Sequence, residues 1–326
     1  MRSILKPIVL AAAMTAASGL AAETANPFLG NWALTIPGGG AGWLGIVETD
    51  GKLTASILWG GGSVVPTQGA KVEGDTLTVT RLYKNKDGTT TETITAKADG
   101  DSLKLATVKS KEGRAEFDKA EFAGKRIPPL PAAPDLSKVK LGEPVSLFNG
   151  KDLEGWKLTS PGAVNGWSVK DGVLTNNPAQ EEGKPHRNYG NLRTVAEFED
   201  FNLKLETNVP KGGNSGIYLR GIYEVQVLDS FGKPLDSHNM GAIYSRIKPT
   251  EAAEKPAGEW QTLDITLVDR HVTVILNDKK IIDNQPLLGC TGGALTSDQF
   301  KPGPIYLQGD HTGANYRNMV LRPLVK

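Results

Sequence analysis

Residues 212–230 read GGNSGIYLRGIYEVQVLDS, and this stretch decides which kind of fold the chain adopts. Apolar and polar residues alternate on both sides of Gly221, which is the period of a β-strand with two different faces. We therefore predict two strands joined at Gly221. One predicted face is apolar and carries Ile217, Leu219, Val225 and Val227.

The opposite predicted face is polar in an unusual way. It carries Tyr218, Arg220, Glu224 and Gln226, and Asp229 closes the run. Strands that only face solvent usually carry Lys, Thr or Ser, whereas these longer side chains suit the binding of a polar ligand. A sheet with an apolar back and such a front is the layout of a carbohydrate site.

Length and composition limit the class of protein. A chain of 326 residues is long for one domain and sufficient for two. The 37 basic and 36 acidic residues nearly balance, so the net charge favours neither nucleic acid nor an anionic membrane surface. The 38 Gly and 20 Pro, together with short alternating runs, predict a turn-rich, mainly β protein. Oligomeric state is left open.

The first 22 residues have the pattern of a secretory signal peptide. Arg2 and Lys6 precede an apolar, Ala-rich run, and small residues lead up to Glu23. The apolar run is too short for a membrane span, which is the alternative. No Cys lies near the predicted cleavage point, so we expect no lipid anchor there and a periplasmic or secreted protein. Cys290 is the single cysteine, which excludes an intrachain disulfide.

Residues 26–126 are predicted to form a small antiparallel β-barrel or sandwich, because short alternating runs are separated by turn residues. The string FLGNW at 28–32 resembles the opening of lipocalin-like barrels, where Gly30 allows a tight bend and Trp32 plugs one end. The runs GWLGI (42–46) and ILWGGGSVV (57–65) are the candidate binding features of this domain, although packing is the favoured role. No catalytic group of residues is evident in it.

Residues 127–144 are predicted to form an extended, polyproline-like spacer stiffened by Pro128, Pro129, Pro131 and Pro134, and they mark the domain boundary. Residues 145–326 then hold many strand-like runs and no convincing helical period. So many antiparallel strands in one domain predict a two-sheet jelly roll.

Several strings in the second domain occur in an order that identifies a family. They are LFNGKDLEGWK (147–157), GWSVKDGVLTN (166–176), FNLKLETNVPKGGNSGIYLRGIYEVQVLDS (201–230), GAIYSRIKPTEAAEKPAGEWQTLDITL (241–267), HVTVILND (271–278) and GPIYLQGDHTGANYRNMVLRPL (303–324). This series resembles the 3-keto-disaccharide hydrolase domain family. The resemblance implies a concanavalin A-like jelly roll with its site on the concave sheet. It also implies glycosides oxidised to a ketone at carbon 3 as substrates, and export from the cell.

Cleavage of such a glycoside needs a base near carbon 2, a stabiliser for the enediolate oxygen and an acid for the leaving group. His238 follows the polar-faced strand and is the candidate base. Glu224, Asp229 and Arg220 complete the catalytic candidates. Simpler roles compete: Arg220 could pair with Glu224 across the hairpin, and Asp229 could cap a turn or orient His238.

Further polar residues are candidates for binding the sugar. Alternation in IYLQGD puts Tyr306, Gln308 and Asp310 on one face, directly before His311. Histidines in such loops can also be merely solvated. The predicted substrate-binding residues are Tyr218, Gln226, Tyr244, Gln308, Asp310 and His311.

A divalent metal is the one cofactor to consider. Asp310 and His311, with Asp229 and Glu224, offer oxygen and nitrogen ligands, and a metal ion would stabilise an enediolate. No tight ligand spacing supports such a site, so the metal is left open.

The resemblance predicts a glycosidase or lyase acting on 3-keto-disaccharides or 3-keto-glucosides, by proton abstraction at carbon 2, elimination and hydration. An ordinary glucanase is one alternative, but it would carry acids as Glu-x-Asp-x-Glu, and here Gln226 and Leu228 follow Glu224. A lectin-like protein that binds carbohydrate without catalysis is the other alternative.

Overall fold

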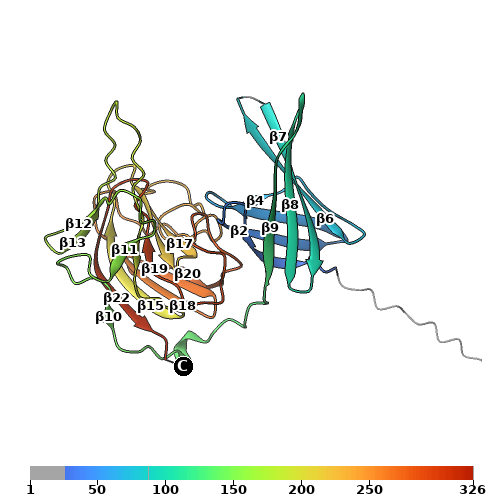
Figure 1. Ribbon diagram of the computed structural model, residues 1–326. Coiled ribbons are helices and arrows are strands. Elements are labelled where there is room, and N and C mark those ends of the chain that lie inside the picture. The colour runs from blue at the N-terminus through green and yellow to red at the C-terminus, as the bar shows by residue number, and fades with distance from the viewer. Residues whose placement is uncertain (1–25, 87, 326) are drawn as a thin grey trace, which may run out of the picture.

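The computed structural model describes residues 26–86 and 88–325, which form two β domains (Figure 1). The predicted signal peptide, residues 1–22, lies outside the described residues. Within those residues the chain has strands, turns and a 3-10 turn at Leu136–Lys138, and none of them belongs to an α-helix. They also include no helix long and apolar enough to cross a membrane.

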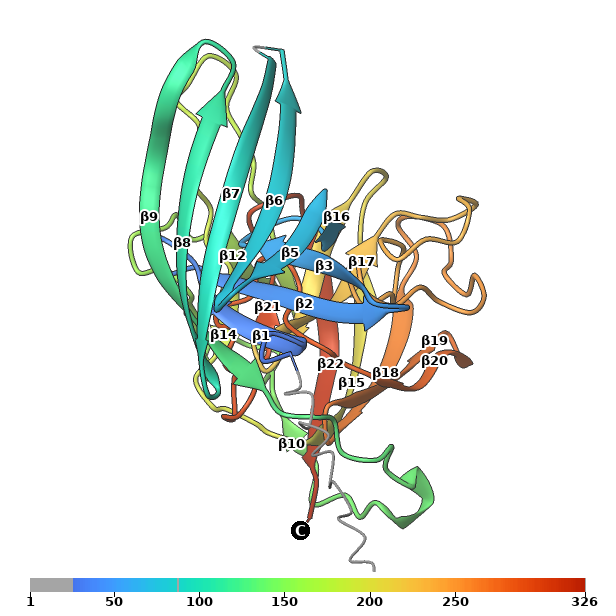
Figure 2. The ribbon, with the colours of Figure 1, turned by 90° about the vertical axis from the view of Figure 1, so that its right-hand side faces the viewer.

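The first domain is one antiparallel sheet of nine strands with the order β4-β3-β2-β1-β9-β8-β7-β6-β5. Its strands are β1 (Gly30–Thr35), β2 (Ala41–Thr49), β3 (Lys52–Trp59), β4 (Val65–Pro66), β5 (Gly69–Glu73), β6 (Thr76–Asn85), β7 (Gly88–Asp99), β8 (Ser102–Lys111) and β9 (Arg114–Ile127). Figure 2 shows β6 to β9 as long, twisted strands that extend beyond the rest of the domain.

This sheet curls in the manner of a barrel without forming a closed ladder among the described residues. The two end strands, β4 and β5, are consecutive in the chain, and only Thr67 and Gln68 separate them. Thr67 N donates to Ala55 O on one side (2.9 Å), and Gln68 N donates to Thr80 O on the other (2.9 Å). The expected small antiparallel β domain is therefore confirmed, in a form that is curled but open.

The concave side of the curled sheet holds its own apolar core. Trp32 is completely buried there, and its indole Nε1 donates to Phe28 O at 2.8 Å. Gly30 has a φ of 106°, a left-handed value that favours glycine and permits the bend before β1. Gly30 thus provides the predicted bend, and Trp32 is buried in the core of the open sheet.

The second domain is a two-sheet jelly roll, as predicted. The larger sheet contains β10 (Val145–Ser146), β12 (Trp167–Lys170), β13 (Val173–Asn176), β15 (Phe201–Asn208), β18 (Gln261–Val268), β19 (His271–Leu276), β20 (Lys279–Pro286) and β22 (Ala314–Pro323). The smaller sheet contains β11 (Trp156–Leu158), β14 (Leu192–Thr194), β16 (Asn214–Leu219), β17 (Tyr223–Leu228) and β21 (Tyr306–Leu307). Apolar side chains of the two sheets form one buried cluster between them.

The hairpin predicted around Gly221 is confirmed as β16 and β17. These antiparallel strands pair Ile217 with Val225 on the core side and Tyr218 with Glu224 on the opposite side. Because side chains alternate along a strand, one register places the whole apolar set in the core and leaves a polar face outside.

The proline-rich segment after β9 lies against the second domain. Arg270 Nη2 donates to Pro129 O at 2.7 Å, and Asn284 Nδ2 donates to Pro134 O at 2.9 Å. The spacer is therefore held along its length by the domain that follows it, as Figure 1 shows below the two sheets.

The two domains are joined by a buried apolar contact centred on Trp43 of β2. Trp43 is 6% exposed and belongs, with Ala33, Ala41 and Leu58, to the same apolar cluster as the core of the second domain. Its indole Nε1 donates to Leu288 O at 3.0 Å. A Cβ atom at Gly289 would overlap the indole ring, so the ring lies directly on the backbone of the second domain.

We predict that Trp43→Ala lowers the free energy of unfolding by about 3–5 kcal/mol, because it leaves a cavity between the domains. Trp43→Phe keeps most of the apolar contact and loses the bond to Leu288, so its loss should be about 1 kcal/mol. Urea denaturation followed by circular dichroism measures both. Equal stability of Trp43→Ala and the wild type would mean that the domains do not stabilise each other.

Candidate functional site

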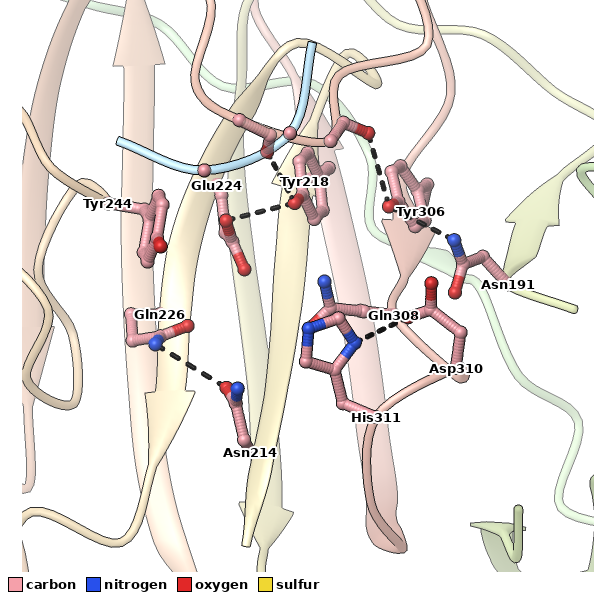
Figure 3. A pocket seen from close by; sticks show the side chains of 14 residues that line it. Asn191, Asn214, Tyr218, Glu224, Gln226, Tyr244, Tyr306, Gln308, Asp310 and His311 are labelled. Atoms are coloured by element: carbon pink, nitrogen blue, oxygen red, sulfur yellow. Dashed lines mark hydrogen bonds and ion pairs between the residues drawn. The ribbon is translucent and has the colours of Figure 1, made fainter. Parts of the chain in front are cut away.

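A pocket of about 220 Å³ lies on the polar face of the smaller sheet of the second domain (Figure 3). Strands β16, β17 and β21 supply its floor, and loops from both domains supply its walls. The residues that line it are Gly61, Gly62, Asn191, Asn214, Tyr218, Glu224, Gln226, Tyr244, Gly292, Gly293, Tyr306, Gln308, Asp310 and His311.

Glu224 is the buried acid of this pocket. It is 3% exposed, and burial raises the pKa of its carboxyl group to about 8, because a charged carboxylate is poorly solvated there. The neighbouring strand gives it room: a Cβ atom at Gly216 would overlap Glu224 Oε1. At neutral pH the free protein therefore holds Glu224 mainly in its neutral form.

The hydrogen bonds of Tyr218 agree with a neutral Glu224. Tyr218 Oη lies 2.7 Å from Gly292 O and 2.9 Å from Glu224 Oε2. A hydroxyl has one proton, and a backbone carbonyl can only accept. If Tyr218 donates to Gly292, a protonated Glu224 can donate to Tyr218, and both contacts are satisfied.

Tyr218 and Tyr306 form a stacked pair beside the acid. Their ring centroids are 4.0 Å apart, with an angle of 11° between the planes. Burial raises the pKa of both phenols above the ordinary value of 10, so both remain neutral hydroxyl groups at neutral pH. Asn191 Nδ2 donates to Tyr306 Oη at 3.3 Å. The pair thus offers neutral polar groups on a rigid aromatic support.

His311 and Asp310 form a second titrating unit on the other side of the pocket. His311 Nδ1 lies 2.7 Å from Asp310 Oδ1, and this hydrogen bond raises the pKa of the imidazole above 6.5. Figure 3 shows the other ring nitrogen turned toward the middle of the pocket. A carboxylate that fixes one nitrogen of a histidine leaves the other free for proton transfer.

Amide side chains occupy the rest of the floor. Gln226 Nε2 lies 3.5 Å from Asn214 Oδ1, and the reversed amide would donate instead to Ser215 O and to Glu224 Oε1. Tyr244 lies at one side of the pocket, and Gln308 lies next to the ring of His311. Such groups donate and accept without charge, which suits the hydroxyl groups of a sugar.

Most of the residues predicted from the sequence line this pocket. They are Glu224, Tyr218, Gln226, Tyr244, Gln308, Asp310 and His311. Their roles in binding or catalysis stay predictions, but the fold brings together segments that are far apart in the chain.

Arg220 does not face the pocket, contrary to the predicted alternation. Strand β16 ends at Leu219, and Arg220 adopts a left-handed φ of 56° in the turn, so the two-residue period no longer applies. Its guanidinium donates to the backbone oxygens of Gln299 and Lys301, and the ion pair with Glu224 does not form.

His238 and Asp229 also lie outside the residues that line the pocket. His238 contacts Asp236 through Nδ1 and Ser63 Oγ through Nε2 (2.8 Å), and its ring meets the edge of Tyr244. Asp229 Oδ2 accepts a hydrogen bond from Gly212 N at 2.8 Å, so it caps the turn before β16 and not the turn at residues 231–232 that was the alternative. Neither side chain bonds to the other.

Some lining residues were not predicted. Asn214 has the same parity as Gly216 and Tyr218 along β16, so the alternation could have identified it. Asn191 and the pair Gly292–Gly293 lie in loops with no such pattern. Gly61 and Gly62 belong to the ILWGGGSVV run. The sequence indicated this run as a binding feature of the first domain, and not as part of a site in the second domain.

The described ranges contain no group of three or more His, Cys, Asp and Glu side chains arranged to hold a metal ion. Asp229, one of the ligands considered for such a site, is bonded to Gly212 N instead. The described side chains that line the pocket are therefore not arranged as a ligand set for a divalent ion.

Comparison with known proteins points to one family. The family model described as a 3-keto-alpha-glucoside-1,2-lyase-like domain matches residues 143–322. A 3-keto-disaccharide hydrolase of Bacteroides thetaiotaomicron is 28% identical in an alignment of 166 residues that covers 43% of this chain and 57% of that protein. The chain thus spans little more than half the length of this curated relative.

Two crystal structures of candidate glycosyl hydrolases from Parabacteroides distasonis are similar to this chain. The first is 30% identical, covers 61% of this chain and 93% of its own, and has a TM-score of 0.47. The second is 26% identical, covers 56% of this chain and 100% of its own, and has a TM-score of 0.42.

The raised pKa of Glu224 predicts how stability depends on pH. Between 4.5 and about 8 the folded protein keeps a proton that the unfolded chain has lost, so the folded state becomes less stable as the pH rises through this range. Glu224→Gln cannot ionise and should lack this loss. Urea midpoints at pH 5 and pH 8 measure the effect, and an identical shift in both proteins would contradict the raised pKa.

Proposed function

Because the chain belongs to the family of 3-keto-alpha-glucoside-1,2-lyase-like domains, we propose that it cleaves glycosides whose sugar ring carries a ketone at carbon 3. The proposed products are the free 3-keto sugar and the released alcohol or second sugar. The observation that carries the proposal is the pocket in which a buried, neutral Glu224 lies on the same polar floor as the His311–Asp310 pair.

The ketone makes an unusual route to bond cleavage available. It acidifies the hydrogen on carbon 2, so a base can remove that proton and leave an enediolate. The electrons then form a double bond between carbons 1 and 2, the bond from carbon 1 to the glycosidic oxygen breaks, and that oxygen takes a proton from an acid. Water then adds its oxygen to carbon 1 and a proton to carbon 2, which completes a net hydrolysis.

The residues of the pocket match these needs. In the proposed assignment neutral His311 takes the proton from carbon 2, with Asp310 holding its ring in place, and protonated Glu224 gives a proton to the leaving oxygen. Gln308 is the proposed donor to the enediolate oxygen, since its neutral amide lies in the buried lining of the pocket.

A catalytic role also explains why the fold tolerates Glu224. Burying a carboxyl group whose pKa rises to about 8 lowers stability at neutral pH, and a lectin that only binds sugar would gain nothing from it. This cost favours an enzyme over the lectin-like alternative. Gln226 is the next residue after Glu224 on the same face of β17, where a glucanase would carry a second acid. This amide disfavours the two-carboxylate mechanism of glucanases on this strand.

We predict that the protein releases 4-nitrophenol from 4-nitrophenyl 3-keto-glucoside and leaves the unoxidised 4-nitrophenyl glucoside intact. The unoxidised compound has no acidic hydrogen at carbon 2 and is the matched control. Absorbance of the phenolate follows the reaction. Equal cleavage of both compounds would support an ordinary glycosidase, and binding without turnover would support the lectin alternative.

The two titrating units predict a bell-shaped dependence of kcat/KM on pH. The rate should rise as His311 loses its proton, above pH 6.5, and fall as Glu224 loses its proton near pH 8. Glu224→Gln and His311→Gln should each lower kcat by about 10²–10⁴-fold, the usual share of an acid or base.

The pH dependence of kcat/KM in His311→Gln distinguishes whether Glu224 is the acid or the base. If Glu224 is the acid, the remaining kcat/KM of this variant only falls with rising pH. A rate that rises with pH would identify Glu224 as the base and reverse the assignment.

A further inference from the structure

The first domain contributes directly to the pocket of the second. Gly61 and Gly62, in the loop between β3 and β4, line the pocket together with residues about 130 to 250 positions later in the chain. Figure 3 shows this segment in light blue, crossing above Tyr218 and Glu224. The loop from Gly60 to Val64 is called the covering loop below.

One side of the covering loop lies against a glycine pair of the second domain. Gly293 N donates to Gly60 O at 3.3 Å. A Cβ atom at Gly292 would overlap the carbonyl oxygen of Gly62, so the two backbones touch without intervening side chains. Gly292 O is also the acceptor of Tyr218, which ties this contact to Glu224.

The other side of the covering loop is bonded across the pocket. Ser63 Oγ lies 2.8 Å from His238 Nε2, and Val64 N donates to Ser245 Oγ at 2.8 Å. His238 in turn packs its ring against the edge of Tyr244, a lining residue, at 4.9 Å between centroids. The loop is therefore held at both ends by groups that border the site.

The body of the first domain keeps the loop in this position. Trp43 is buried against Gly289, and Arg246 lies over the indole ring at 4.5 Å from its centroid. Ser297 Oγ adds a hydrogen bond to Leu34 O at 2.8 Å. These three contacts between the domains do not involve the covering loop. They hold the first domain, and with it the loop, in a fixed position over the floor of the pocket.

We propose that the first domain is a fixed wall of the sugar site, and that its covering loop sets the size of the sugar unit that enters. The claim rests on the proposed function for the identity of the ligand. The pocket volume of about 220 Å³ lies below the ~300–1,000 Å³ of sites that enclose drug-sized ligands, and matches a single ring better than a chain. His238 then acts on the sugar only indirectly, by holding Ser63.

Gly61 provides the test. A Cβ atom at Gly61 meets no other atom within 4 Å, and the residue has no left-handed φ, so the fold accepts a side chain there. Gly61→Trp places that side chain at the edge of the pocket. Gly69→Trp is the matched control, because Gly69 has the same open surroundings in the same domain and lies outside the pocket lining.

We expect Gly61→Trp to lower kcat/KM for 4-nitrophenyl 3-keto-glucoside by at least about tenfold, equivalent to ~1.4 kcal/mol, mainly through a higher KM. Gly69→Trp should match the wild type, and both variants should unfold at the wild-type temperature. Wild-type kinetics in Gly61→Trp would overturn the proposal.

A second readout does not depend on activity. With Gln308→Cys as background, the rate of alkylation by iodoacetamide reports access to the floor, and the native Cys290 is fully buried. Adding Gly61→Trp should slow the reaction about tenfold or more, and adding Gly69→Trp should not. Equal rates in the two double variants would show that the loop does not bound the pocket.

The two readouts separate the two claims. A wild-type protein that leaves every 3-keto-glycoside intact would sink the proposed function, while the alkylation rates would still decide whether the covering loop bounds the pocket. Slower alkylation together with unchanged kinetics in an active enzyme would overturn the role of the loop in substrate size.

Discussion

The burial of one carboxyl group, Glu224, is the constraint on which the site depends. The hairpin of β16 and β17 sets it opposite Tyr218, the missing side chain at Gly216 makes space for it, and the contact of Tyr218 with Gly292 closes it from above. Desolvation then keeps the carboxyl neutral at a pH where an exposed glutamate would be charged. The apolar packing beneath the hairpin holds this arrangement, because a shift of one residue in register would turn Glu224 into the core.

The sequence contains enough information to predict the hairpin, the two-sheet fold and most of the pocket floor. Alternation is a local property: once β16 and β17 exist, Tyr218, Glu224 and Gln226 must share a face. The same logic applies to Tyr306 in β21 and to Gln308 directly after it, and the resemblance to a known family implied the jelly roll. Gly30 shows that a short motif can also predict a bend correctly.

The sequence did not predict the positions of side chains in turns and loops or the contacts between the two domains. Arg220 was placed on the polar face because the alternation was continued one residue past the end of β16, into a left-handed turn. His238 follows the polar strand in sequence, yet its partner Ser63 lies 175 positions away and belongs to the other domain. Asn191 and Gly292 come from loops whose course depends on packing, and no local pattern marks them. Contacts of this kind depend on how two domains meet, and a single sequence carries no direct signal for that.

The docking of Trp43 against Gly289 has a consequence for how correct folding of the protein is recognised. Its hydrogen bond joins residues 245 positions apart, which makes it one of the most distant contacts in the chain. Closing a loop of this length has an entropy cost that the docking contacts must offset. The strands of each domain pair only within the sheets of that domain, so a chain with all its strands formed and its domains undocked would leave Glu224 without its covering loop. Native secondary structure is therefore an incomplete sign of a correctly folded molecule, because the pocket also requires that the two domains dock.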